Sequence, residues 1–128
     1  MKIISTTQAP QAIGPYSQAM IVDGMLYTSG QIGLTPDGNL IGEGIEEQTD
    51  QVLKNLSAVV AEAGGSLDDV IKTTIFLADM DDFAAVNKIY AKYFGNHKPA
   101  RSTVAVRTLP LGVKVEIECI AKPSNYSY

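Results

Sequence analysis

Two charged residues near the C-terminus have the types and the spacing to act on a small acid. Arg101 opens the segment RSTVAV, and Glu116 lies in the segment VKVEIECIA. A guanidinium holds a carboxylate through two parallel hydrogen bonds, and a carboxyl group transfers protons to and from water. Together they would anchor an acidic substrate and activate water beside it. The pattern leaves open a plainer alternative, in which both are solvated charges on an exposed sheet face.

Strand alternation predicts which sheet face these groups occupy. Side chains alternate between the two faces, so the apolar set is expected to pack on the helices. That set is Val104, Val106, Val113, Val115, Ile117, Cys119 and Ala121. A hairpin of residues 101–108 with residues 113–122 would place Arg101, Thr103 and Glu116 together on the opposite face. Arg101 and Glu116 would then be diagonal neighbours about 7–8 Å apart at the backbone, and placement on opposite sides of the sheet would contradict this.

The elements that must position these groups follow from hydrophobic periodicity and turn residues. Strands are expected over residues 16–22, 25–32, 70–79, 101–108 and 113–122, and helices over residues 45–63 and 82–94. The Asp23-Gly24 pair indicates the turn of the first hairpin. The order ββαβαββ predicts an α+β fold with both helices on one face of a mixed sheet. The length predicts a single domain over residues 1–128.

Composition narrows the class of partner and the compartment. The net charge of -4 argues against nucleic acid, because phosphate binding needs clustered lysine and arginine. The N-terminal segment lacks the apolar stretch of a signal peptide, and no stretch is long enough to span a bilayer. We therefore expect a soluble cytoplasmic protein without nucleic-acid or membrane partners. The one cysteine excludes an intrachain disulfide.

Asn87, Ser29 and Gly30 each allow a structural and a functional interpretation. Asn87 falls on the apolar stripe of the second predicted helix with Phe83 and Tyr90, where an amide is satisfied by the backbone or lines a cleft. Ser29 would bond a ligand or the backbone at its strand end. Gly30 would permit a special backbone angle or a close approach. The surrounding TSGQIG segment lacks the lysine and spacing of a phosphate loop.

His97 is the one histidine and Cys119 the one cysteine of the chain. A soft-metal site needs several such ligands, so none is expected within one chain. Nothing marks a nucleophile beside His97, which argues against Ser-His-Asp catalysis. Cys119 shares the core face of its strand and is expected to be an inert buried thiol.

Five segments, taken in order, resemble the RidA subgroup of the Rid family, the imine and enamine deaminases. They are GPYSQA, TSGQI, KTTIFLADMDDFAAVN, PARSTVAV and VKVEIECIA, and the resemblance covers nearly the whole chain. It implies a chorismate-mutase-like α+β fold and a homotrimer with a central barrel and three clefts between subunits. It also implies hydrolysis of 2-imino acids or their enamine tautomers, such as 2-aminoacrylate and 2-iminobutanoate, to 2-keto acids and ammonia. These intermediates arise from PLP enzymes acting on serine or threonine, and no cofactor is implied.

The resemblance also assigns roles by position. Arg101 matches the arginine that holds the substrate carboxylate, and Glu116 matches the acid that orients or activates the attacking water. The positions that line the cleft are Tyr16, Ser29, Gly30 and Asn87. Thr103, a substrate-binding candidate, departs from the pattern because many relatives carry cysteine there. Water is the nucleophile, so the chemistry does not require that thiol.

Two other functions stay open. A small-ligand binding or regulatory protein could use the same clefts for 2-keto acids or amino acids without turnover. RNA cleavage has been attached to some relatives, but the acidic balance and the lone His97 argue against it.

Overall fold

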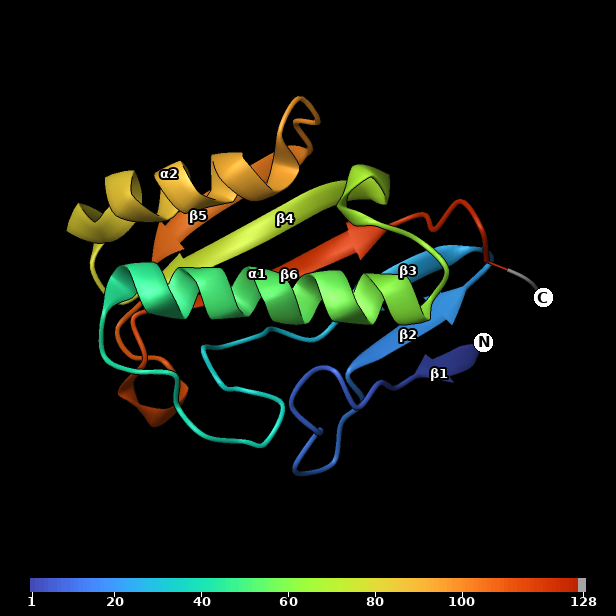
Figure 1. The fold of residues 1–128 in the computed structure, drawn as a ribbon, viewed down its shortest axis with the longest axis horizontal. Coiled ribbons are helices and arrows are strands. Elements are labelled where there is room, and N and C mark those ends of the chain that lie inside the picture. The colour runs from blue at the N-terminus through green and yellow to red at the C-terminus, as the bar shows by residue number, and fades with distance from the viewer. Residues whose placement is uncertain (127–128) are drawn as a thin grey trace.

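The structure, a computed structural model, describes residues 1–126, which form a six-stranded sheet with two helices on one face (Figure 1). The strand order is β1-β2-β3-β6-β4-β5. The strands are β1 Lys2–Ile4, β2 Ala19–Val22, β3 Met25–Thr28, β4 Val70–Leu77, β5 Ala100–Ala105 and β6 Val115–Ala121. The helices are α1, Ile45–Glu62, and α2, Phe83–Phe94. The predicted α+β class is confirmed; the last two residues of the predicted 1–128 domain lie outside the described residues.

The N-terminal strands differ from the prediction. β1 was not predicted, because three residues are too short to show alternation. The strand expected from Tyr16 begins only at Ala19. The turn between β2 and β3 is as predicted, with positive φ at both Asp23 and Gly24.

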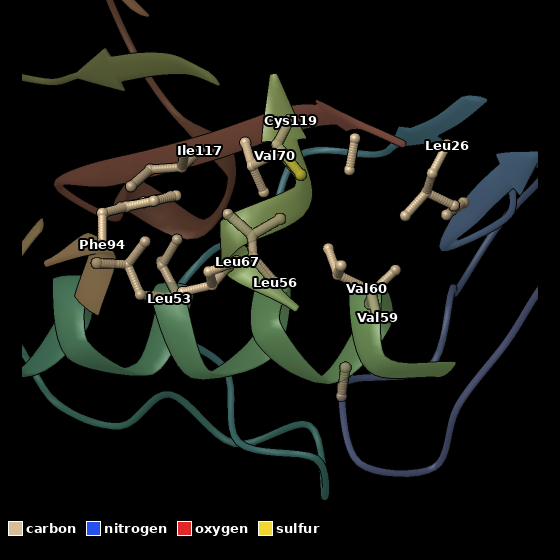
Figure 2. Close-up of a cluster of buried hydrophobic side chains, with 14 of the residues drawn as sticks. Leu26, Leu53, Leu56, Val59, Val60, Leu67, Val70, Phe94, Ile117 and Cys119 are labelled. Atoms are coloured by element: carbon tan, nitrogen blue, oxygen red, sulfur yellow. The ribbon is translucent and has the colours of Figure 1, made fainter. Parts of the chain in front are cut away.

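The core lies between α1 and the centre of the sheet. Leu53, Leu56, Val59 and Val60 of α1 are buried, and Figure 2 shows them beside Ile117 and Cys119 of β6. Burial of each such aliphatic side chain contributes roughly 1.5–3 kcal/mol. The predicted core face of residues 113–121 is confirmed, because its apolar members are all buried.

Both helices connect parallel strands. α2 links β4 to β5, which pair in parallel, and α1 links β3 to β4. β6 lies between β3 and β4 and is antiparallel to both. A parallel connection needs a crossover, and a helix is the usual one. The two crossovers place both helices over the same face of the sheet (Figure 1).

The predicted hairpin between residues 101–108 and residues 113–122 is wrong. β5 pairs with β4 instead, so β4 separates β5 from β6. Thr73 lies opposite Arg101, and Phe76 lies opposite both Val104 and Glu116. Thr73 is fully buried under α2, so Arg101 is on the helix-covered face.

Val104 and Glu116 therefore lie on the open face, and Arg101 lies on the other. Val104 was expected in the core but is 43% exposed. The rule that apolar strand residues face the helices fails here because the open face is itself partly apolar. The link from β5 to β6 crosses the end of β4, where the N–H of Val106 donates to the carbonyl of Leu77.

Candidate functional site

Glu116 lies in a cavity of about 420 Å³ at the end of β3, which we call the Glu116 pocket. Its lining includes Tyr16, Ser29, Gly30, Gln31, Pro110 and Glu116. The chain continues from β3 alongside β6, because Gln31 and Ile117 exchange backbone hydrogen bonds of 2.9 and 3.1 Å. This bridge brings residues 29–31 against the strand that carries the acid. Tyr16, Ser29, Gly30 and Glu116, four of the predicted site residues, are thus brought together.

Gly30 lets the loop after β3 approach the side chain of Glu116 closely. A Cβ on Gly30 would collide with the carboxylate of Glu116. Of the two reasons considered for this glycine, close approach is confirmed, and no positive φ is involved.

Glu116 is half-buried without a compensating charge. Burial, and next the negative charge of Glu118, raise the pKa of the Glu116 carboxyl above its ordinary value. Within residues 1–126 no hydrogen bond or ion pair engages this carboxylate. A raised pKa makes the ionised carboxylate a stronger acceptor of protons than an exposed glutamate.

The hydroxyl of Ser29 donates to the carbonyl of Ser17 at 2.6 Å, as the structural interpretation expected. Its oxygen keeps lone pairs that can accept from a ligand. Tyr16, at the rim, is 55% exposed. The two residues therefore offer polar groups to a ligand in the Glu116 pocket.

Gln18 was missed by the sequence analysis. Its buried side chain accepts from the N–H of Thr6 at 2.7 Å and donates to the carbonyls of Thr6 and Pro10 at 3.1 and 2.7 Å. It thereby fixes the N-terminal segment that forms one wall of the Glu116 pocket. The signal was the glutamine of GPYSQA, which periodicity does not explain.

Arg101 lies beside a second cavity, of about 280 Å³, between α2 and the start of β5, which we call the Arg101 pocket. Its lining includes Asn87, Tyr90, Phe94, His97, Lys98 and Arg101. Arg101 donates from Nη1 to Oδ1 of Asn87 at 2.8 Å. Asn87 is exposed and lines this cavity. The structure therefore fits the interpretation of Asn87 as a cleft-lining residue better than that of an amide satisfied by the backbone.

The remaining candidates, Thr103, His97 and Cys119, show no sign of a catalytic or metal-binding role in the structure of residues 1–126. Thr103 is half-buried on the same sheet face as Arg101 and lines neither pocket. Nε2 of His97 lies 2.6 Å from the carbonyl oxygen of Val70. Burial raises the pKa of the Cys119 thiol to about 11, in keeping with the inert thiol predicted. Among the described residues no cluster of ligands could hold a metal ion.

The predicted convergence of Arg101 and Glu116 within one chain is wrong. Their partners on β4 are Thr73 and Phe76, which face opposite sides of the sheet. The Glu116 pocket is lined by no lysine or arginine, and the Arg101 pocket by no carboxylate, within the described part of the chain. Within one chain the carboxyl group of Glu116 and the guanidinium of Arg101 therefore lie in two separate pockets.

Comparison with known families and proteins places the chain. Residues 6–122 match the family described as Endoribonuclease L-PSP. A mouse protein named 2-iminobutanoate/2-iminopropanoate deaminase is 53% identical over 121 residues, which cover 94% of this chain and 90% of that one. A Lactococcus lactis protein, AldR, whose name includes the word "regulator", is 54% identical over 95% of this chain and 98% of that one.

Solved structures with a comparable sequence identity share the fold of this chain. The crystal structure of Escherichia coli TdcF with bound serine is 44% identical, with a TM-score of 0.92. The match covers 97% of this chain and 100% of that chain. That protein binds a small amino acid.

Proposed function

This chain belongs to the Endoribonuclease L-PSP family and, within it, to the RidA subgroup of imine and enamine deaminases, and on this premise we propose that it hydrolyses small 2-imino acids to 2-keto acids and ammonia. The expected substrates are 2-iminobutanoate, 2-iminopropanoate and their enamine tautomers, including 2-aminoacrylate. The relatives' names support this activity for the chain as a whole. The assignment of residues within the site is our proposal.

The observation that supports this assignment is the pair of complementary pockets. The Arg101 pocket offers a guanidinium for a carboxylate, and the Glu116 pocket offers an acid with a raised pKa. A 2-imino acid needs both, because its carboxylate must be held and its imine carbon must meet water. The half-burial of Glu116 and the hydrogen bond from Arg101 to Asn87 favour this assignment over the plainer alternative of two solvated surface charges.

The hydrolysis requires only proton transfers around the bound imine. The Arg101 guanidinium orients the substrate through its carboxylate. The Glu116 carboxylate accepts a proton as the oxygen of water forms a bond to the imine carbon. When the imine is bound in its protonated form, addition of water leaves a neutral amine, and the proton returned from Glu116 makes that amine a leaving group. The Glu116 carboxylate then takes the proton of the new hydroxyl as the C–N bond breaks, and ammonia and the 2-keto acid are released.

We infer a homotrimer in which the two pockets meet between subunits. Tyr27 and Val104 are exposed on the open sheet face, 45% and 43% respectively, and such apolar surface favours association. β5 lies at the sheet edge with its outer side unpaired among the described residues. Cyclic symmetry would set the Arg101 pocket of each subunit against the Glu116 pocket of the next. Three identical clefts would result.

Keto-acid release from enzyme-generated imine tests the function. Threonine dehydratase supplies 2-iminobutanoate, and wild-type protein should accelerate the appearance of 2-oxobutanoate over the spontaneous rate. Arg101→Ala should abolish the acceleration while the assembly stays folded. Arg107, an exposed arginine just beyond β5, provides the matched control, and Arg107→Ala should behave as wild type. Absence of acceleration by the wild-type protein would refute the proposal.

A regulatory protein that binds keto acids or amino acids is the second candidate, favoured by the name of the Lactococcus relative. The same pockets would serve it, since carboxylate binding needs no turnover. Calorimetry that shows tight binding of 2-oxobutanoate, with no acceleration of imine hydrolysis, would support it. Incubation with RNA tests the endoribonuclease name of the family, and we expect no cleavage by a nuclease-free preparation.

A single domain and a cytoplasmic location stay predictions. One continuous sheet supports the first, and a free buried cysteine is compatible with the second. No helix within residues 1–126 combines the length and the apolar character needed to cross a membrane.

A further inference from the structure

Arg101 is held against α2 by two aromatic rings as well as by Asn87. Its guanidinium carbon lies 5.3 Å from the ring centroid of Phe83 and 4.9 Å from that of Tyr90. Phe83, Asn87 and Tyr90 follow one another at four- and three-residue spacing, so they form one stripe of the helix. Both rings are within the distance at which a cation is attracted to an aromatic face.

The rings are themselves fixed. The hydroxyl of Tyr90 lies 2.8 Å from the hydroxyl of Thr73, which is fully buried beneath α2. The Tyr90 ring also packs on Phe94, with centroids 4.5 Å apart. Phe83 packs against the hydrophobic core. Because the rings cannot turn freely, they define where the guanidinium lies.

The guanidinium nevertheless keeps donors for a ligand. A guanidinium has five N–H groups, and within residues 1–126 the one hydrogen bond that Arg101 donates uses Nη1 alone. No carboxylate of residues 1–126 forms an ion pair with it. Arg101 is therefore preset in orientation but left with unused donors.

We propose that Phe83 and Tyr90 are positioning residues that hold the Arg101 guanidinium in the orientation that binds a substrate carboxylate. This inference rests on the proposed function, in which Arg101 binds that carboxylate. A long arginine side chain in solution samples many rotamers, and ordering it on binding weakens affinity. The rings order it before the ligand arrives. They thus favour carboxylates over neutral analogues of the same shape.

Binding of 2-oxobutanoate and of its neutral analogue 2-oxobutanamide, measured by calorimetry, tests the proposal. Phe83→Leu should raise the Kd of 2-oxobutanoate about fivefold, the value expected for one cation–π contact, and leave that of the amide unchanged. Tyr90→Leu should do the same, whereas Tyr90→Phe keeps the ring and should bind as wild type. In turnover, KM should rise more than kcat falls.

Tyr93→Leu is the matched control for lost packing. Tyr93 lies on α2, and its hydroxyl donates to Oδ1 of Asp50 at 2.6 Å, away from Arg101. This variant should lower Tm without changing either Kd. If Phe83→Leu and Tyr90→Leu bind 2-oxobutanoate as wild type while Arg101→Ala does not, the role of the rings is overturned and the carboxylate site stands. Equal binding by wild type and Arg101→Ala would overturn the site itself.

A measurement on the unmodified protein covers the case in which a ring variant fails to fold. Side-chain nuclear magnetic resonance of Arg101 should show hindered rotation of its guanidinium and ring-current shifts from two aromatic faces, without ligand. The exposed Arg107 should show neither. Free rotation of the Arg101 guanidinium would contradict the proposal.

Discussion

The Glu116 pocket is walled by loops, whereas the Arg101 pocket lies between a helix and a strand. Backbone N–H and C=O groups in loops lack the hydrogen-bond partners that a neighbouring strand provides. In the Glu116 pocket, buried amide side chains act as those partners. Gln18 bonds the N-terminal wall, and Asn55 of α1 donates to the carbonyls of Ile32 and Leu34. The Arg101 pocket needs no such supports, because α2 presents Asn87 and two rings directly.

The difference follows from what each group must do. A carboxylate becomes a stronger base when its pKa is raised, and the partial burial of Glu116 raises that pKa. Arginine stays charged in almost any environment, so its pocket has to supply orientation instead. A loop-built pocket therefore tunes the pKa of an acid, and a pocket built on a helix positions a cation.

Mixing two inactive variants tests whether the pockets work as halves of one site, and it has the largest expected effect. Arg101→Ala and Glu116→Gln should each lower activity about 10²-fold or more. In a cyclic assembly of randomly mixed subunits, about a quarter of the clefts would combine an intact Arg101 with an intact Glu116, so about a quarter of wild-type activity should return.

The controls separate this result from simple refolding. Each variant refolded alone should stay inactive, and a protein that carries both substitutions should rescue neither. Activity measured after refolding an equal mixture decides the outcome. A mixture no more active than its components would mean that the two residues act independently, or that one chain provides the whole site.

Gly30→Ala tests the close approach that the loop makes to Glu116. The added Cβ would push the carboxylate out of place, and a shift of about 1 Å at a catalytic group costs about 10²-fold in rate. Gly38→Ala is the control, since Gly38 has open space around it and only its positive φ makes alanine unfavourable. It should lower stability by about 1 kcal/mol and leave kcat unchanged. Equal kcat for both variants would show that Glu116 tolerates displacement.

The sequence allowed the elements to be predicted well, because helix and strand periodicity are local. The core face of β6 followed from alternation alone. Strand order did not, because pairing between distant segments depends on which crossover each helix makes. The nearest-neighbour assumption joined β5 to β6, and that error put Arg101 on the wrong face.

The candidate site was predicted as residue types and motif positions but not as geometry. Alternation assumed that every apolar strand residue faces the helices, and Val104 violates this on the open face. The stripe of Phe83, Asn87 and Tyr90 was visible in the sequence. The sequence places its rings on an apolar stripe, but nothing in the sequence shows that the Arg101 side chain lies over them.

Gln18→Ala tests the amide supports of the loop-built pocket. It leaves the N–H of Thr6 and the carbonyl of Pro10 without their partner, which should lower the free energy of unfolding by about 1–3 kcal/mol. The loosened wall should raise KM several-fold, with a smaller change in kcat. Urea unfolding and keto-acid release measure the two effects. No matching loss is expected for Gln8→Ala, whose exposed side chain bonds, within residues 1–126, its neighbour Thr7 alone.

Glu118→Gln should have the smallest effect, a shift of the pH profile alone. The charge of Glu118 is the second cause, after burial, of the raised pKa of Glu116, so its removal should lower that pKa. If Glu116 acts as the base, activity falls as pH drops through its pKa, and in the variant this fall should move to lower pH.

The raised pKa of Glu116 also makes the stability of the protein depend on pH. A raised folded pKa favours the protonated form, so its contribution to stability is complete below the ordinary glutamate pKa and is lost as pH rises through the raised one. Glu116→Gln should therefore stabilise the protein at neutral pH relative to wild type and lose that advantage in acid. An unchanged acid limb in Glu118→Gln would show that burial alone sets the pKa of Glu116.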